Sequence, residues 1–161
     1  MISLIALLSC FSSIDAEANG DHLKTLEPST VDWKGKKPAY WKEVLSAEQV
    51  RVCREAGTER PWSSPLNKAK EDGAFLCSSC GQPLFAGEDK FESGTGWPSF
   101  TQPLDDGVVT LHSDLAFGMV RTEVTCSRCD AHLGHVFGDG PAPTGKRYCI
   151  NGVCLIEPPA E

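Results

Sequence analysis

Two CxxC motifs constrain this chain more than any other feature of its sequence. Cys77-Ser-Ser-Cys80 and Cys126-Ser-Arg-Cys129 are separated by residues 81–125. Two thiolates in one tight turn reach a metal at about 2.3 Å, so two such turns complete a tetrahedron. Four thiolates leave no open coordination position, which predicts one structural Zn²⁺ that ties two distant hairpins together. A redox CxxC is the alternative, but such motifs occur singly at a helix N-terminus.

Length and composition place the chain among ordinary globular proteins. It has 161 residues, of which 40% are hydrophobic and 23% charged, as expected for one domain. The net charge of −7 argues against a nucleic-acid partner, which would be held by phosphate contacts. The apolar run at residues 2–8 is far short of the roughly 20 residues that span a bilayer. We therefore expect no membrane span and no nucleic acid, and we predict a monomer.

The first residues resemble a secretory leader. An apolar run is followed by Ala16-Glu17-Ala18, the A-x-A pattern that signal peptidases cut. No Lys or Arg precedes the run, so a cytoplasmic location stays open as the alternative. Leu7-Leu8-Ser9-Cys10 is a looser lipoprotein motif in which Cys10 would carry the lipid. We predict export to the periplasm, with residues 1–18 as the leader, 19–30 as a polar linker and 31–161 as one domain.

Local patterns predict one short helix followed by an antiparallel β domain. Ser46-Ala47-Glu48-Gln49 is a capping box and Gly57 a stop signal, which indicates a helix over about residues 47–55. Its buried stripe would hold Ala47, Val50 and Cys53. After Gly73, short alternating runs between Gly, Pro and Asp are typical of strands. The expected strands cover residues 74–77, 108–112, 117–125, 132–137 and 147–156.

One further cysteine has neighbours that suit catalysis. The cysteines outside the two motifs and the leader are Cys53, Cys149 and Cys154. Strand alternation places Arg147, Cys149 and Asn151 on one face and Tyr148 and Ile150 on the other. A cation about two residues away lowers a thiol pKa, and an amide can hold a thiolate or its oxidised form, so Cys149 is a candidate nucleophile. A half-exposed cysteine on a polar face is the alternative.

Two histidines and a tryptophan are the other candidates for the site. Gly134 lies between His132 and His135 and permits a bulge that would bring both rings to one face. Paired imidazoles near a thiol supply general acid chemistry near neutral pH, although a metal pair or core histidines fit the same spacing. Trp97 lies in a turn between glycines, and aromatic residues on such turns often form the wall of a ligand pocket. A buried tryptophan of the core is the alternative.

Together these motifs resemble the B-type methionine sulfoxide reductases, which act on the R epimer. The resemblance covers about Trp41 to Ile156. It is carried by CSSCG at 77–81, KFESGTGWPSF at 90–100, RTE at 121–123, CSRC at 126–129, HLGHVF at 132–137, DGP at 139–141 and RYCIN at 147–151, with GTERP at 57–61. It implies a mainly β domain of two antiparallel sheets with a short N-terminal helical segment. It also implies structural zinc and the repair of oxidised methionine in proteins and peptides.

The same resemblance assigns roles to the site residues. Cys149 would attack the sulfoxide sulfur and become a sulfenic acid as methionine leaves. His132, His135 and Asn151 would surround the sulfoxide oxygen, with Arg147 and Asp139 supporting them. Trp97 would line the pocket for the substrate methyl. The zinc ligands would be Cys77, Cys80, Cys126 and Cys129.

The chain departs from part of this family in the thiol that resets Cys149. Some members have a resolving cysteine where this chain has Thr95. Cys154 is a poor substitute, because five residues of extended strand span about 16 Å and a disulfide needs Cα atoms within about 7 Å. Cys53 is the remaining candidate, with a core role as the alternative. Otherwise an external thiol would reduce the sulfenic acid, either thioredoxin, as is usual in the family, or a membrane-fed thiol relay outside the cytoplasm.

Three other functions explain part of the sequence. A zinc-stabilised peptide-binding module without turnover would use the CxxC motifs and Trp97, but it leaves the Cys149 strand and the histidines idle. A thiol peroxidase or disulfide exchanger would use Cys149 with Cys53 and would not distinguish sulfoxide epimers. A papain-like protease is disfavoured, because it would not need the zinc ligands and its cysteine would not lie late in the chain on a strand.

Overall fold

The structure is a computed structural model that describes residues 30–68, 73–115 and 120–157. The expected leader, Cys10 and nearly all of the expected linker lie outside the described residues, as do residues 117–119 of one expected strand. Within the described ranges, no helix has the length and hydrophobicity needed to cross a membrane.

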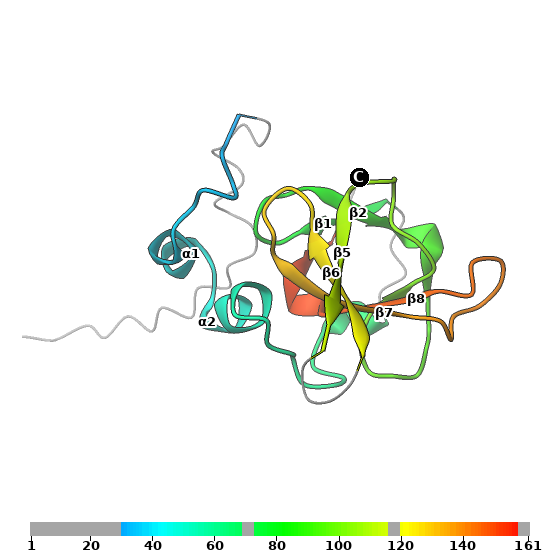
Figure 1. Cartoon of the computed structure of the whole chain (residues 1–161). Helices are drawn as coiled ribbons and strands as arrows, with labels where there is room; N and C mark the ends of the chain where they lie inside the picture. Colours follow the sequence, from blue (N-terminus) through cyan, green and yellow to red (C-terminus); the bar gives the residue numbers. More distant parts are fainter. Residues whose placement is uncertain (1–29, 69–72, 116–119, 158–161) are drawn as a thin grey trace, which may run out of the picture.

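Short helices precede the β domain and lie at one side of it (Figure 1). They are α1 (Pro38–Val44), α2 (Ala47–Gln49) and the π-helical turn η2 (Val50–Arg54). The described residues that follow include the 3₁₀ turns η3 (Pro65–Asn67), η4 (Gly87–Asp89) and η6 (Gly152–Cys154). Helix α1 was not predicted, since its N-cap Lys37 makes no capping hydrogen bond with its side chain.

The predicted capping box starts the second helix. The Gln49 N–H donates to Ser46 Oγ at 3.2 Å, and the Ser46 N–H donates to Gln49 Oε1 at 3.0 Å. The helix then widens, because the Glu55 N–H donates to the Val50 carbonyl, five residues back, at 3.1 Å. This wider turn alters the buried face: Val50 and Cys53 are buried as predicted, whereas Ala47 is exposed.

The β domain contains two antiparallel sheets, as predicted. The strands are β1 (Ala74–Cys77), β2 (Pro83–Ala86), β3 (Lys90–Phe91), β4 (Ser99–Phe100), β5 (Val109–Asp114), β6 (Arg121–Cys126), β7 (His132–Phe137), β8 (Arg147–Ile150) and β9 (Leu155–Ile156). The smaller sheet has the order β2-β1-β9 and the larger the order β3-β4-β8-β7-β6-β5. Three strands, β2 to β4, were not predicted, and the expected strand over 147–156 is split by η6.

Aromatic side chains from both sheets form the core between them. Phe85 of β2 stacks on Phe100 of β4 with ring centroids 4.5 Å apart, and Phe75 of β1 meets Phe100 edge-on at 5.3 Å. All three rings are fully buried, and each contributes on the order of 2 kcal/mol of hydrophobic free energy. This packing fixes the smaller sheet against the strand that pairs with β8.

Candidate functional site

Each of the two CxxC motifs forms a hairpin turn, and the two turns have the same hydrogen-bonding pattern. The Gly81 N–H donates to the Cys77 carbonyl at 2.8 Å, and the Asp130 N–H donates to the Cys126 carbonyl at 2.9 Å. Gly81 (φ 68°) and Asp130 (φ 56°) both have left-handed backbone, which glycine adopts freely and aspartate tolerates. A CxxC followed by Gly or Asp therefore closes the β1–β2 turn and the β6–β7 turn alike.

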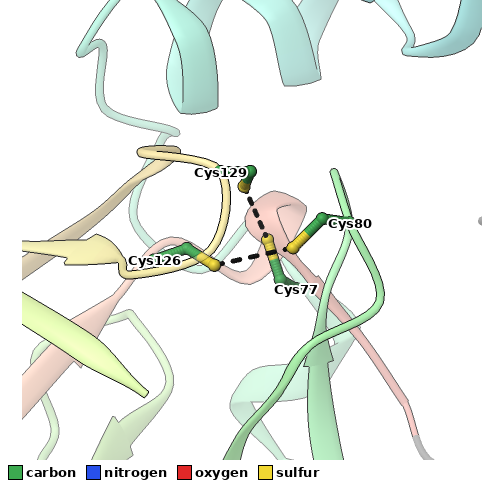
Figure 2. A group of neighbouring side chains, drawn as sticks. All are labelled: Cys77, Cys80, Cys126 and Cys129. Atoms are coloured by element: carbon green, nitrogen blue, oxygen red, sulfur yellow. Dashed lines mark hydrogen bonds between the residues drawn. The ribbon is translucent and has the colours of Figure 1, made fainter. Parts of the chain in front are cut away.

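The four cysteine sulfurs meet where these hairpins face each other (Figure 2). All four side chains are fully buried, and their sulfurs lie within 4.8 Å of one another. The Cys77 and Cys129 sulfurs are 3.8 Å apart, and those of Cys80 and Cys126 are 3.6 Å apart. Zinc–sulfur bonds of about 2.3 Å in a tetrahedron require sulfurs about 3.8 Å apart. The cluster can therefore hold a metal ion, and its spacing fits zinc.

Cys149 lies on β8, an inner strand of the larger sheet. It pairs with Ser99 on β4 and with His135 on β7. Tyr148 and Ile150 are buried in the core, whereas Cys149 is half-buried and lines a cavity of about 160 Å³. The predicted alternation of β8 is confirmed, and it presents the thiol to this cavity.

The cavity brings together several of the predicted site residues. Its lining includes Trp97, His135, Cys149 and Asn151, together with Thr58 and Phe137. Three predicted site residues do not line it: His132, Arg147 and Asp139. The His132 ring contacts the His135 ring, the Arg147 guanidinium lies over the Phe137 ring, and Asp139 accepts a hydrogen bond from Arg147. Gly134 also lines it, and a Cβ there would overlap the Cys149 carbonyl, so the close approach of β7 to β8 requires glycine.

Opposing influences act on the Cys149 thiol. Burial raises its pKa above the ordinary value, while the charge of Arg147 and a contact with Thr95 act to lower it. The Thr95 Oγ1 lies 4.0 Å from the Cys149 sulfur. Arg147 is held in place by Asp139, to which its Nε and Nη2 donate at 2.9 and 3.0 Å, and by the Phe137 ring, 4.5 Å from the guanidinium carbon. A bidentate clamp of this kind fixes the cation near the thiol.

The two histidines lie on one face of the sheet, as the bulge prediction required. The register of β7 against β6 shifts between Val124 and Thr125, which inserts one extra residue between the histidines on β7. The His132 and His135 rings are consequently in contact, with centroids 5.5 Å apart and planes at 66°.

One ring nitrogen of each histidine forms a hydrogen bond with a carboxylate, and this bond orients the ring. His132 Nδ1 lies 2.6 Å from Glu123 Oε1, and His135 Nε2 lies 2.8 Å from Asp114 Oδ2. Ionised carboxylates accept hydrogen bonds only, so these nitrogens donate and the other nitrogen of each ring remains for chemistry. Burial lowers the pKa of His132, and the Glu123 carboxylate acts against that shift. Arg121 donates to the same Asp114 oxygen at 2.7 Å.

Glu59 holds two walls of the cavity through its backbone. Its N–H donates to Asn151 Oδ1 at 3.0 Å, and its carbonyl accepts from Trp97 Nε1 at 3.2 Å. Asn151 Nδ2 donates to the Leu133 carbonyl at 3.0 Å, which leaves a second amide N–H on that nitrogen. The amide and the indole are thus both oriented by residues outside the cavity.

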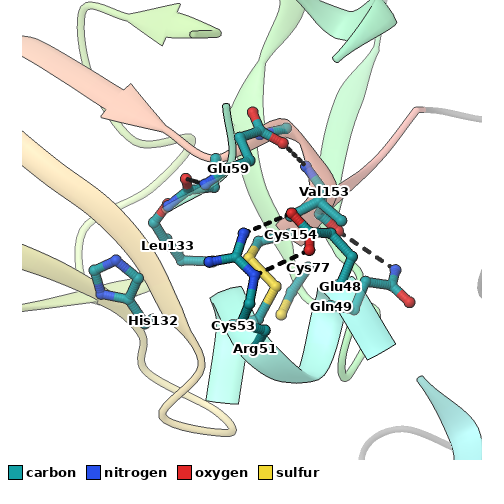
Figure 3. The surroundings of a disulfide bond; sticks show 12 residues. Glu48, Gln49, Arg51, Cys53, Glu59, Cys77, His132, Leu133, Val153 and Cys154 are labelled. Atoms are coloured by element: carbon teal, nitrogen blue, oxygen red, sulfur yellow. Dashed lines mark hydrogen bonds and ion pairs between the residues drawn. A yellow bond between two sulfur atoms is a disulfide. The ribbon is translucent and has the colours of Figure 1, made fainter. Parts of the chain in front are cut away.

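The Glu59 side chain anchors this arrangement to η6. Its carboxylate accepts from the Gly152 N–H at 2.7 Å and from the Val153 N–H at 2.9 Å (Figure 3). Burial raises the Glu59 pKa, and these two hydrogen bonds oppose the rise. The loop after η2 is therefore tied to the residues that follow Cys149 on the chain.

The predicted resolving role of Cys53 needs correction. Cys53 of η2 forms a disulfide with Cys154 of η6, with Cα atoms 5.7 Å apart, and both side chains are buried (Figure 3). The chain turns through η6 after β8, so Cys154 is carried away from Cys149 and onto η2. In this structure Cys53 is not a free thiol, and it is not paired with Cys149.

Sequence reasoning missed the residues that orient the predicted ones. Asp114 and Glu123 hold the histidines and Glu59 holds the tryptophan turn, yet none was predicted as a site residue. Glu123 lies within the RTE motif and Glu59 within GTERP, so their places in these motifs were the available signal. Asp114 had no such signal, because its partner His135 lies two strands later in the sequence.

Comparison with known proteins agrees with this geometry. The SelR domain matches residues 45–158. The chain is 56% identical over 115 residues to the peptide methionine sulfoxide reductase MsrB of Pseudomonas putida strain GB-1, covering 71% of this chain and 88% of the relative. It is 58% identical over 115 residues to the protein of that name from Methanosarcina barkeri, covering 71% and 81%. The chain therefore belongs to the SelR family, the B-type methionine sulfoxide reductases.

Proposed function

We propose that this chain reduces methionine-R-sulfoxide in proteins and peptides through direct attack by Cys149. The observation that carries the proposal is the position of the Cys149 thiol in a small cavity walled by Trp97, His135 and Asn151. Two relatives more than half identical to this chain are named as peptide methionine sulfoxide reductases. The alternative function, a peptide-binding module, does not explain the ion pair between Arg147 and Asp139 or the two histidine–carboxylate pairs.

The reaction is an oxygen transfer with a two-electron change at each sulfur. The Cys149 sulfur bonds to the substrate sulfur while a proton reaches the sulfoxide oxygen. The protonated oxygen then passes to Cys149 as a hydroxyl group, while its bond to the substrate sulfur and the new bond between the two sulfurs both break. The substrate sulfur gains two electrons and leaves as the thioether of methionine, and Cys149 loses two and becomes a sulfenic acid.

Proton delivery falls to the histidine pair. His135 lines the cavity and is paired with Cys149 across β7 and β8. Asp114 and Glu123 each hold one nitrogen of a ring. The second N–H of Asn151 is placed to orient the sulfoxide oxygen. Protonation of the sulfoxide oxygen makes the sulfoxide sulfur electrophilic. The acid and the Cys149 thiolate must therefore approach the sulfoxide from opposite sides.

We propose one structural Zn²⁺ at Cys77, Cys80, Cys126 and Cys129. Bound zinc would supply stability rather than chemistry, because four thiolates fill its tetrahedron. Cys77 ends β1 of the smaller sheet and Cys126 ends β6 of the larger one, so the metal would hold the two sheets together.

We propose that an external thiol, thioredoxin or a similar protein, resets Cys149. Thr95 lies beside Cys149, and Cys53 is bonded to Cys154. Two external thiols would reduce the sulfenic acid to the thiol and release water, and they would leave as a disulfide. The Cys53–Cys154 disulfide supports export, since disulfides persist in oxidising compartments.

The test is turnover of the two epimers by the full-length chain. Purified protein is given free methionine-R-sulfoxide or methionine-S-sulfoxide with dithiothreitol, and methionine is measured. We expect turnover of the R epimer alone. Binding of an oxidised peptide without turnover of either epimer, by folded and zinc-loaded protein, would instead establish the binding module.

A further inference from the structure

An exposed tryptophan next to the cavity has no part in the reaction described above. Trp62 is 62% exposed and has φ +66°. Left-handed backbone is rare for bulky residues, and such outliers gather at functional sites. The large exposed apolar residues of the described ranges also include Leu104 and Leu111, but Trp62 is the only aromatic among those described.

Trp62 is fixed to the turn that presents Trp97. Its N–H donates to the Gly96 carbonyl at 2.7 Å, and Asn67 Nδ2 donates to the same oxygen at 2.9 Å. Gly96 is buried with φ +96°, and a Cβ there would lie only 2.8 Å from the Pro61 Cβ. The loop that carries Trp62 is therefore packed directly on the residue before Trp97.

The two tryptophans share a hollow next to Trp97. Trp97 lines the Cys149 cavity and also a second hollow of about 90 Å³, whose lining includes Trp62 and Phe91. Beyond it, Trp62 and Lys68 line a further depression of about 410 Å³. We call the surface formed by Trp62, Asn67, Lys68 and Phe91 the tryptophan shelf.

The size of the Cys149 cavity indicates what the shelf receives. A volume of about 160 Å³ corresponds to about five water molecules and falls below the usual range for small-molecule sites. A cavity of this size has room for one side chain such as that of an oxidised methionine. The polypeptide on either side of that residue must lie outside the cavity, and the shelf adjoins the cavity through Trp97.

We propose that the tryptophan shelf binds the polypeptide that flanks the oxidised methionine, and that Trp62 is its main contact. An exposed indole supplies a large apolar contact at small entropic cost, as in other protein recognition sites. The shelf thereby makes the chain selective for peptide-bound over free methionine sulfoxide. This inference rests on the proposed reduction at Cys149.

The experiment compares a peptide containing methionine-R-sulfoxide with the free amino acid as substrates. Trp62→Gly removes the indole and places a glycine at a left-handed position that glycine adopts freely, so the fold should be retained. We expect the ratio of kcat/KM for the peptide to that for the free amino acid to fall about tenfold, mainly through KM. Trp62→Phe should keep most of the ratio, and the matched control Leu104→Ala should keep all of it.

The outcomes separate this inference from the proposed function. An unchanged ratio in Trp62→Gly, or an equal loss with both substrates, would overturn the role of the shelf. Trp62→Asn, which also suits left-handed backbone, provides the same test if the glycine variant fails to fold. Absence of turnover of the R epimer by the wild-type chain, both free and in the peptide, would instead refute the proposed function.

Discussion

Among the described residues, the free cysteine thiols lie in two different kinds of surroundings. The four metal-site cysteines are fully buried at the ends of two hairpins, with sulfurs as one another's nearest partners. Cys149 is half-buried at the centre of a strand, beside a cavity, a cation and a histidine. Local packing thus suits the four clustered thiols to hold a metal ion and leaves the Cys149 thiol accessible from the cavity.

The difference can be traced to the backbone around each thiol. The CxxC turns place two sulfurs on the same side of each hairpin, and the aromatic core brings the hairpins together. Strand β8 alternates instead, so that Cys149 lies between core residues that point the other way. A metal ion would use up the lone pairs of the first group, whereas the sulfur of Cys149 stays available to a substrate.

Replacing the reactive thiol gives the largest expected change. Cys149→Ser should lower kcat/KM for methionine-R-sulfoxide by roughly 10³-fold or more, because the hydroxyl is a much weaker nucleophile. Zinc content and Tm should stay close to wild type, since the residue faces a cavity. Substantial remaining turnover would show that another thiol carries the reaction.

Replacing a metal-site thiol should change stability instead. Cys126→Ser should abolish metal binding and lower the free energy of unfolding by several kcal/mol, because binding of structural zinc contributes directly to folding. Metal analysis and thermal unfolding, with Cys149→Ser as the matched control, measure this. A variant that keeps wild-type Tm without metal would contradict the structural role of the cluster.

The disulfide offers an intermediate case. Changing Cys53 and Cys154 together to Ala should lower the free energy of unfolding by about 2–4 kcal/mol. Turnover with dithiothreitol should persist, because neither residue touches the substrate. Loss of thioredoxin-dependent turnover alone would restore Cys53 as the resolving thiol and contradict recycling by an external thiol only.

The smallest expected effect concerns the charge beside Cys149. Burial raises the Cys149 pKa, so the thiolate fraction, and with it kcat/KM, should rise with pH from neutral towards that pKa. Arg147→Met removes the charge that opposes this shift, so the rising limb should move by about one unit to higher pH. Lys42→Met, on exposed α1, is the control and should leave the profile in place. A shift to lower pH would mean that Arg147 does not stabilise the thiolate.

The sequence predicted most readily what depends on neighbouring residues. The capping box at Ser46, the strand that ends at Cys77 and the alternation around Cys149 are all local patterns, and the structure confirms them. The bulge in β7 could also be predicted from local sequence, because Gly134 lies between the two histidines and glycine permits such a bulge.

Contacts between distant segments were harder to predict. Strands β3 and β4 have two residues each, too few for a periodic pattern. The bond between Cys53 and Cys154 depends on where η6 turns after β8, which no spacing rule gives. Asp114 reaches His135 only because β5 and β7 flank β6 in the sheet.

The most direct test of the account is a single turnover without reductant. Full-length, zinc-loaded protein is mixed with one equivalent of methionine-R-sulfoxide and then with a reagent that labels sulfenic acids. The labelled residues are identified by mass spectrometry. The account predicts label on Cys149 alone, with one methionine formed per chain and zinc retained. Methionine formed with the label on Cys77, Cys80, Cys126 or Cys129, and zinc released, would contradict the division between structural and reactive thiols.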